Sequence, residues 1–329
     1  MILAGDIGGT KVNLASFVVD DGRLTMVSSA TFPSRDHASL AEIVRQFIHP
    51  LDHPVETACF GVAGPIRNGR VHLTNLSWII DEEELGRALG FKRVFLMNDL
   101  QANAYGIAAL QPEDLIELNR GSDASGGNIA IISAGTGLGE AGLHCCGHRF
   151  ISIASEGGHS DFAPRTDLDI ELLRYLRDRF GQVSWEHVLS GPGFYHIYQF
   201  LRDTGRGEEP AWLTEEFKTI DPPIAITRAG LAERCDLCVQ TLDLFVNYYG
   251  AEAANLALKF LSTGGLYVGG GIAPKIISRI ADGRFMRSFI GQGRMKDLLA
   301  SIRVRVIMND KTALLGAARY AAIETDLMS

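Results

Sequence analysis

The stretch ILAGDIGGTKVNLASFVV, residues 2–19, decides the fold. Its two apolar runs flank Asp6-Ile7-Gly8-Gly9-Thr10, a pattern that predicts two β-strands joined by a glycine-containing loop. Such a loop can be a simple hairpin turn, or it can hold a charged ligand. A second loop of the same kind elsewhere in the chain would favour the ligand.

A second glycine loop does occur, because GTGLG at residues 135–139 follows the apolar run IAIISA. Glycine lets backbone N–H groups converge without a Cβ in the way, and converging N–H groups bind anions. Two such loops can hold one polyphosphate. Thr10 and Thr136 add hydroxyl donors, while Asp6 could either hold Mg²⁺ through water or cap its own turn.

Strand and helix patterns alternate along the rest of the chain. Ser39 opens a helix whose apolar residues share one face, with Glu42 as its partner in a capping box. Further strands are expected in ETACFGVAGPI (56–66), RVFLMND (93–99) and LYVGGGIAP (266–274), and helices in DEEELGRALG (81–90), DLDIELLRYLRDRFG (167–181), residues 227–260 and TALLGAARYAAIE (312–324). The alternation predicts an α/β fold.

Composition limits the function classes. The 329 residues are 46% apolar and 21% charged, which is typical of a globular protein large enough for two domains. A net charge of -8 without a basic block argues against nucleic acid as a partner. No apolar stretch approaches the ~20 residues that cross a bilayer. Five cysteines cannot all pair, so we expect free thiols and a cytoplasmic protein.

Two other phosphate-binding motifs have recognisable sequence signatures. GxxxxGK[ST], the P-loop, does not occur. Residues 137–142 match GxGxxG, which leaves an NAD-dependent oxidoreductase as a remote alternative. That fingerprint requires a helix to begin on the glycines, whereas AGLHCCGHRFISI is rich in strand formers. Cys235 and Cys238 form a CxxC within a helical pattern, which favours packing over metal binding.

Seven motifs occur in an order that resembles the bacterial ATP-dependent glucokinases: GDIGGT (5–10), LTNLSW (73–78), MNDLQA (97–102), GTGLG (135–139), EGGHSDFAP (156–164), VLSGPG (188–193) and GGGIAP (269–274). The resemblance implies the actin-like, ribonuclease H-like ATPase fold, with two α/β domains, an interdomain cleft and often a homodimer. We expect residues 1–109 plus 310–329 to form a small domain and residues 110–309 a large one.

The resemblance also implies the site. The ATP phosphates would lie against Gly5, Asp6, Ile7, Gly8, Gly9 and Thr10 and against Gly135, Thr136 and Gly137, with Gly269, Gly270 and Gly271 beside the adenosine. The sugar contacts would come from Asn98, Asp99, Glu156, His159 and Glu186, with Asn75 lining the pocket. Such side chains suit a hexose because each can bond two neighbouring hydroxyls.

Phosphoryl transfer needs a carboxylate near the attacking hydroxyl, and Asp99 stands at the carboxyl end of a predicted strand. The resemblance implies that the chain phosphorylates the 6-hydroxyl of glucose with Mg-ATP, giving glucose 6-phosphate and ADP, with Asp99 as the general base. Asn98-Asp99 could instead merely cap the following helix. A non-catalytic sugar- and ATP-binding regulator, or an assembly ATPase of the same fold, stays open as an alternative.

Two charged residues depart from the family pattern. Glu140 follows Gly139, where a carboxylate beside polyphosphate would be unfavourable unless it points away or touches the metal. Lys259 places a charge near the presumed nucleotide side. Glu156, His159 and Asp161 could also be read as zinc ligands, but no cysteine-rich CxCG segment follows them.

Overall fold

The computed structural model describes residues 1–73, 76–122, 126–147 and 149–328. The chain divides into two compact units. Unit 1 comprises Met1–Asp114, Cys146–Ala154 and Asn309–Ser329, and unit 2 comprises Leu115–Cys145 and Ser155–Met308. The sequence-based boundaries assigned the segment Cys146–Ala154 to the large domain. It belongs to unit 1, where Ser152 is hydrogen-bonded to Gln101 and Tyr105.

Unit 1 is built on a sheet of order β3-β2-β1-β4-β7. Its elements are β1 (Ile2–Ile7), β2 (Lys11–Asp20), β3 (Arg23–Pro33), α1 (Leu40–Ile48), β4 (Thr57–Val62), β5 (Arg70–His72), β6 (Ile79–Asp81), α2 (Glu82–Leu89), β7 (Arg93–Asn98), α3 (Asp99–Gly106), β11 (Arg149–Ser155) and α12 (Thr312–Glu324). Strands β1, β4 and β7 are parallel, while β2 returns antiparallel to β1. The predicted hairpin over residues 2–19 is confirmed.

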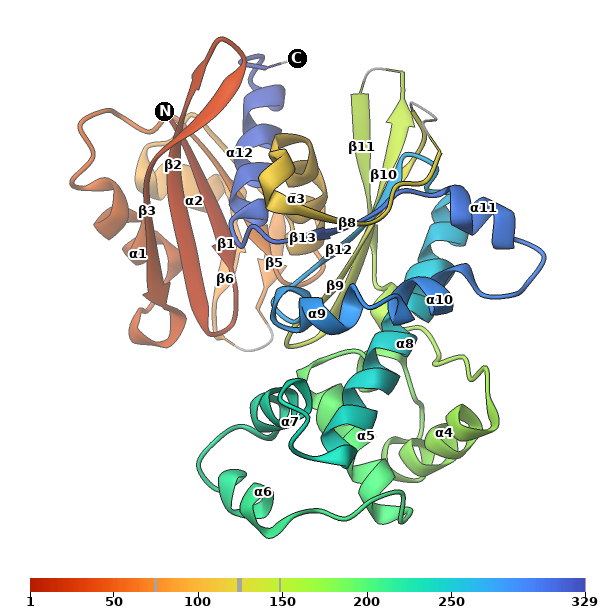
Figure 1. Cartoon of the computed structure of the whole chain (residues 1–329). Helices are drawn as coiled ribbons and strands as arrows, with labels where there is room; N and C mark the ends of the chain where they lie inside the picture. The colour runs from red at the N-terminus through yellow and green to blue at the C-terminus, as the bar shows by residue number, and fades with distance from the viewer. Residues whose placement is uncertain (74–75, 123–125, 148, 329) are drawn as a thin grey trace. The chain divides into compact units, whose positions relative to one another are not determined.

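Helices cover both faces of this sheet. Leu3 of β1 packs with α1 in one apolar cluster, whereas Ile2 and Ala4 pack with α12 in another, because successive strand residues point to opposite faces. Helices α3 and α12 lie side by side (Figure 1). They approach closely because a Cβ on Gly316 would come 1.7 Å from the carbonyl oxygen of Ala102.

Unit 2 contains the strand order β10-β9-β12-β13-β8. Its elements are β8 (Leu115–Asn119), β9 (Ile129–Ala134), β10 (Leu138–Cys146), α4 (Asp167–Phe180), α5 (Gly191–Asp203), α6 (Ala211–Glu216), α7 (Pro222–Leu231), α8 (Asp236–Phe260), β12 (Gly265–Gly269), α9 (Ile277–Ile280), α10 (Arg284–Ile290), α11 (Lys296–Ser301) and β13 (Val304–Ile307). The core surrounds α8, which contacts α5, α7 and α10 (Figure 1). The rings of Phe194 and Phe245 stack there at 3.9 Å.

Two local predictions are corrected. The pattern over residues 227–260 is not one helix: α7 ends at Leu231 and α8 begins at Asp236, with Glu233 at a positive φ of 54° between them. Ser39 caps α1 by accepting from the backbone N–H of Glu42, but the Glu42 carboxylate accepts from Ala38. The capping box is therefore only half formed.

None of the described helices is long and apolar enough to cross a membrane.

Candidate active site

The first glycine loop follows β1 at the carboxyl end of that strand in the unit 1 sheet. The N–H of Gly8 donates to the carbonyl of Lys11 at 3.0 Å, and the hydroxyl of Ser34 donates to the carbonyl of Gly8 at 2.9 Å. These bonds hold the turn through Gly9 and Thr10 in one conformation. A fixed turn is what a backbone anion site requires, because its N–H groups need no reordering on binding.

The residues before this turn have different surroundings. The side chain of Ile7 is fully buried, so only its backbone can meet a ligand. Gly5 is buried within β1, where a Cβ would come 2.4 Å from the Phe60 ring. The glycine at position 5 is therefore explained by core packing.

Asp6 is held by a neighbouring strand. The amide nitrogen of Asn13 on β2 donates to its Oδ2 at 3.0 Å, and Thr31 on β3 donates to the Oδ1 of Asn13 at 2.9 Å. Burial raises the pKa of Asp6, while the bond from Asn13 and the charge of Lys11 act to lower it. A carboxylate whose charged form is disfavoured by burial gains from a nearby cation, so Asp6 suits Mg²⁺.

Asn98 is the last residue of β7, and Asp99 follows it at the same carboxyl end of the sheet. In the parallel register Asp6 lies opposite Gly61 on β4, and Val62 on β4 lies opposite Asn98 on β7. The carboxyl ends of three neighbouring strands thus bring Asp6, Asn98 and Asp99 to one edge, where open α/β sheets bind their ligands.

The helix-cap alternative for Asn98 is confirmed as geometry. Its Oδ1 accepts from the N–H of Leu100 at 2.9 Å, and Gln101 accepts from the N–H of Asn98. Asp99 is the first residue of α3, and its Oδ1 also accepts from Leu100. The cap fixes the backbone from which the Asp99 side chain projects, so capping and a role in chemistry are compatible.

The second glycine loop, in unit 2, is held by Glu186 and Gly191. The N–H of Gly191 donates to the carbonyl of Gly135 at 2.8 Å, and the N–H of Leu138 donates to the Oε2 of Glu186 at 2.8 Å. A Cβ on Gly137 would come 2.4 Å from that same Oε2. The exposed Thr136 lies at the tip of the loop.

Glu186 also faces a predicted sugar residue. Its Oε1 lies 4.0 Å from the Nδ1 of His159, whose side chain is 62% exposed. Glu156, also exposed, directly precedes the short 3₁₀ turn Gly157–His159. One carboxylate thus joins the backbone of the glycine loop to the predicted sugar-binding turn.

The third glycine segment, Gly269–Gly271, ends β12. Gly270 has a φ of +84°, and a Cβ there would meet the carbonyl oxygen of Ala134 at 2.3 Å. The hydroxyl of Tyr249 donates to the carbonyl of Gly269 and accepts from the N–H of Ala134, each at 3.0 Å. The Tyr249 hydroxyl thus connects the ends of β9 and β12, where two of the glycine segments begin. The sequence carries no signal of this role, because an aromatic residue at helical spacing is typical of any buried helix face.

The GxGxxG match is resolved by β10. Residues 138–146 form a strand antiparallel to β9, so no helix begins on these glycines. The geometry that a dinucleotide fingerprint requires is thus missing from this segment, which contradicts the NAD alternative.

The two departures from the family pattern form one cluster. Glu140 is 1% exposed and lies inside unit 2, and Lys259 pairs with Glu252 on α8 at 3.3 Å. Neither is explained by contact with phosphate. Asn75, predicted to line the sugar pocket, lies outside the described residues.

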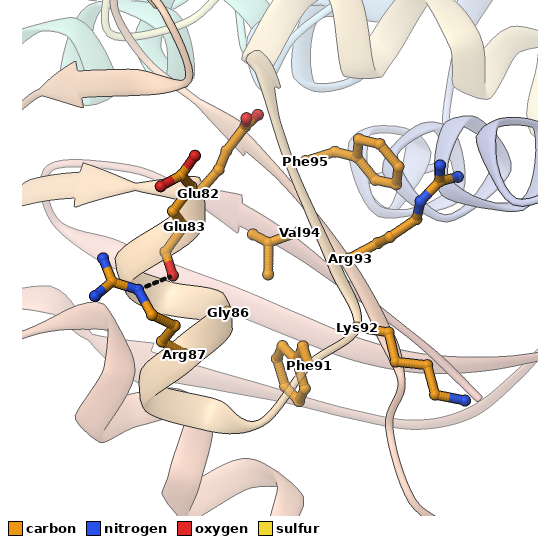
Figure 2. Close-up of a pocket in the computed structure, with 9 residues that line it drawn as sticks. All are labelled: Glu82, Glu83, Gly86, Arg87, Phe91, Lys92, Arg93, Val94 and Phe95. Carbon is orange, nitrogen blue, oxygen red and sulfur yellow. Dashed lines mark hydrogen bonds between the residues drawn. The ribbon is translucent and has the colours of Figure 1, made fainter.

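A pocket of about 520 Å³ lies elsewhere on unit 1 (Figure 2). It is lined by Glu82, Glu83, Gly86, Arg87, Phe91, Lys92, Arg93, Val94 and Phe95 of α2 and β7 and the turn between them. Its lysine already pairs with Glu56 at 2.9 Å. None of the residues predicted to bind ATP or sugar lines it, so it is separate from the candidate site.

Comparisons with known proteins show the family to which the chain is similar over nearly its whole length. The family model described as Glucokinase matches residues 3–324. A glucokinase of Nostoc punctiforme is 44% identical, over 98% of this chain and 99% of its own. The crystal structure of a glucokinase from an Antarctic psychrotroph is 33% identical with a TM-score of 0.87, covering 98% of each chain.

A more distant solved structure shows the shared fold alone. It is a ROK family glucokinase from Streptomyces griseus in complex with glucose and AMPPNP, 21% identical with a TM-score of 0.65, covering 98% of this chain and 99% of its own. These likenesses confirm the predicted actin-like ATPase fold.

Proposed function

Because this chain belongs to the glucokinase family, it is an enzyme that phosphorylates glucose with ATP, and from that premise we propose that Asp99 is the general base of the reaction. The Asp99 carboxylate takes the proton of the 6-hydroxyl as that oxygen attacks the γ-phosphate in line. Glucose 6-phosphate and ADP are the products.

The assignment of Asp99 as the base is supported by its position at the carboxyl end of the unit 1 sheet, where Asp6 also lies. Asp6 lies near the end of β1 and Asp99 directly follows β7, and these two strands flank β4. The capped start of α3 fixes the backbone that carries Asp99, because Asn98 accepts from the N–H of Leu100 and Gln101 accepts from the N–H of Asn98. A general base must be held rigidly within reach of the proton that it accepts.

We propose the phosphate contacts by unit. Unit 1 contributes the backbone of Gly5–Thr10, and unit 2 contributes Gly135–Gly137, with Gly269–Gly271 beside the adenosine. The Asp6 carboxylate would hold Mg²⁺ together with phosphate oxygens and water, which is usual for this ion. Mg²⁺ when bound would neutralise charge on the phosphates.

The proposed sugar contacts are Asn98 in unit 1 and Glu156, His159 and Glu186 in unit 2, with Asn75. Glu186 can accept from a sugar hydroxyl through Oε1, because its Oε2 is already engaged by Leu138. We further propose a cytoplasmic homodimer that uses neither nucleic acid nor a membrane as a partner.

The function is tested by product formation from the purified chain. ATP is supplied with glucose, mannose, fructose or N-acetylglucosamine, and both the sugar phosphate and ADP are measured. We expect stoichiometric glucose 6-phosphate and ADP. Binding of ATP and glucose without product would favour the regulator alternative, and ADP released without sugar phosphate would favour an assembly ATPase.

A further inference from the structure

The carboxyl group of Glu140 on β10 is buried without a hydrogen-bond donor. Both oxygens are inaccessible to water, and neither accepts a hydrogen bond from any donor in the described part of the chain. A buried carboxylate in that condition is strongly unfavourable. The group needs a proton or a partner.

Helix α8, which packs against the neighbouring strand β9, offers a second acid. Glu252 is fully buried. Its carboxylate oxygens accept hydrogen bonds from the Nδ2 of Asn255 at 2.7 Å and from the Nζ of Lys259 at 3.3 Å. Tyr249 on the same helix and Arg165, which donates to the carbonyl of Ala251, are the other titratable groups nearby. Two adjacent buried carboxyls favour holding one proton between them.

The charges around Glu140 support a shared proton. Burial, and then the charge of Glu252, raise the pKa of Glu140 to about 8, against an opposing effect of Lys259. The pKa of Glu252 is also raised by burial. At neutral pH the pair therefore carries a proton that can bridge the two side chains.

The same carboxyl group packs against the predicted sugar-binding turn. A Cβ on Gly157 would come 1.9 Å from the Oε2 of Glu140, so carboxyl and backbone are in direct contact. Gly157 begins the turn that ends at His159, and Glu156 directly precedes it. Any movement of the Glu140 carboxyl therefore acts on the backbone that carries both side chains.

We propose that Glu140 is a positioning residue for glucose: sharing one proton with Glu252, it holds the Gly157 backbone so that Glu156 and His159 can bind the sugar. The proposal rests on the proposed sugar contacts of Glu156 and His159. Loss of the shared proton leaves two buried carboxylates that repel each other, which displaces the turn and weakens glucose binding.

The test is glucose binding by calorimetry with the whole chain between pH 6.5 and 9. The Kd for glucose of the unmodified protein should rise above pH 8, up to about tenfold at pH 9. The reason is that the fraction of protein that keeps the proton falls about tenfold for each pH unit above the pKa. Glu140→Gln stays neutral, so its Kd should be flat. Glu140→Ala should bind glucose weakly at every pH while its ATP affinity is unchanged. Glu117→Gln, an exposed glutamate on β8, is the control and should follow the unmodified protein.

A Glu140→Gln variant that repeats the rise of the unmodified protein, or a Glu140→Ala variant with normal glucose affinity, would overturn the proposal. If Glu140→Ala does not fold, Glu252→Gln replaces it and should also give a flat Kd above pH 8. His159→Ala separates the two levels of inference. Normal glucose binding in that variant contradicts the sugar site itself, whereas weak binding there with normal binding in Glu140→Ala contradicts only the positioning role.

Discussion

Gly61 on β4 lies directly beneath Asp99. A Cβ at position 61 would be 3.6 Å from the Cα of Asp99 and 2.9 Å from the Cβ of Ala102. The latter distance is too short for two methyl groups, so any side chain at position 61 must push α3 away from the sheet. The absence of a side chain on one strand thus sets the position of the proposed base.

Gly61→Ala should therefore lower kcat by up to about 100-fold, because a displacement of the base by roughly 1 Å is sufficient for such a loss. The glycine loops are untouched, so the KM for ATP should change little. Steady-state kinetics of glucose 6-phosphate formation measure both. Ala102→Gly in the same chain removes the colliding methyl and should restore part of the activity. Gly293→Ala, which meets no atom within 4 Å, is the control. Equal activity in Gly61→Ala and Gly293→Ala would contradict the account.

Asn13→Ala should weaken the use of Mg²⁺. The bond from Asn13 lowers the pKa of Asp6 against the effect of burial, so its removal raises that pKa further and leaves less carboxylate to hold the ion. Activity is then lost as the pH falls, and the loss begins at a higher pH than in the unmodified protein. The Mg²⁺ concentration for half-maximal rate at pH 7 should rise roughly tenfold, the usual effect of losing a hydrogen bond to a charged group.

Thr31→Val is the graded comparison for that variant, since it removes only the bond that orients Asn13. Its Mg²⁺ requirement should fall between those of Asn13→Ala and the unmodified protein. If Asn13→Ala and the unmodified chain showed the same Mg²⁺ titration between pH 6 and 8, Asp6 would not be the metal ligand.

Glu186→Ala should raise the KM for both substrates. Its carboxylate accepts from the N–H of Leu138 in the glycine loop and faces His159. Each KM should therefore rise about tenfold, the effect of losing one hydrogen bond to a charged group. His159→Ala should raise the KM for glucose alone. Initial rates at varied ATP and varied glucose separate the effects. A normal KM for ATP in Glu186→Ala would show that the bond to Leu138 does not organise the loop.

Local patterns predicted much of this fold because they are decided over a few residues. The closing helix α12 spans the predicted residues 312–324, and the strands carrying Asp6 and Asn98 lie where apolar runs ended on polar residues. The break between α7 and α8 was missed because Glu233 takes a left-handed conformation that glycine or asparagine normally signals.

Contacts distant in sequence could not be predicted in the same way. The burial of Glu140 depends on β10 pairing with β9 and on α8 packing against β9, and residues near Glu140 in the sequence indicate neither. The hydrogen bond from Asn13 to Asp6 depends on the register of the hairpin, and that register is set by how β1 pairs with β2. Family resemblance named candidate site residues, while three-dimensional packing showed what holds them.

Asp99→Asn shows whether Asp99 takes the proton from glucose, since the amide keeps the shape of the side chain and the helix start but cannot act as a base. The rate of glucose 6-phosphate formation is measured at saturating ATP and glucose, beside calorimetric binding of each. Asp167→Asn, at the first residue of α4, is the matched control. We expect Asp99→Asn to bind both substrates while its kcat falls by at least ~100-fold, the usual contribution of a positioned base. A kcat close to that of Asp167→Asn would contradict the assignment of Asp99 as the base.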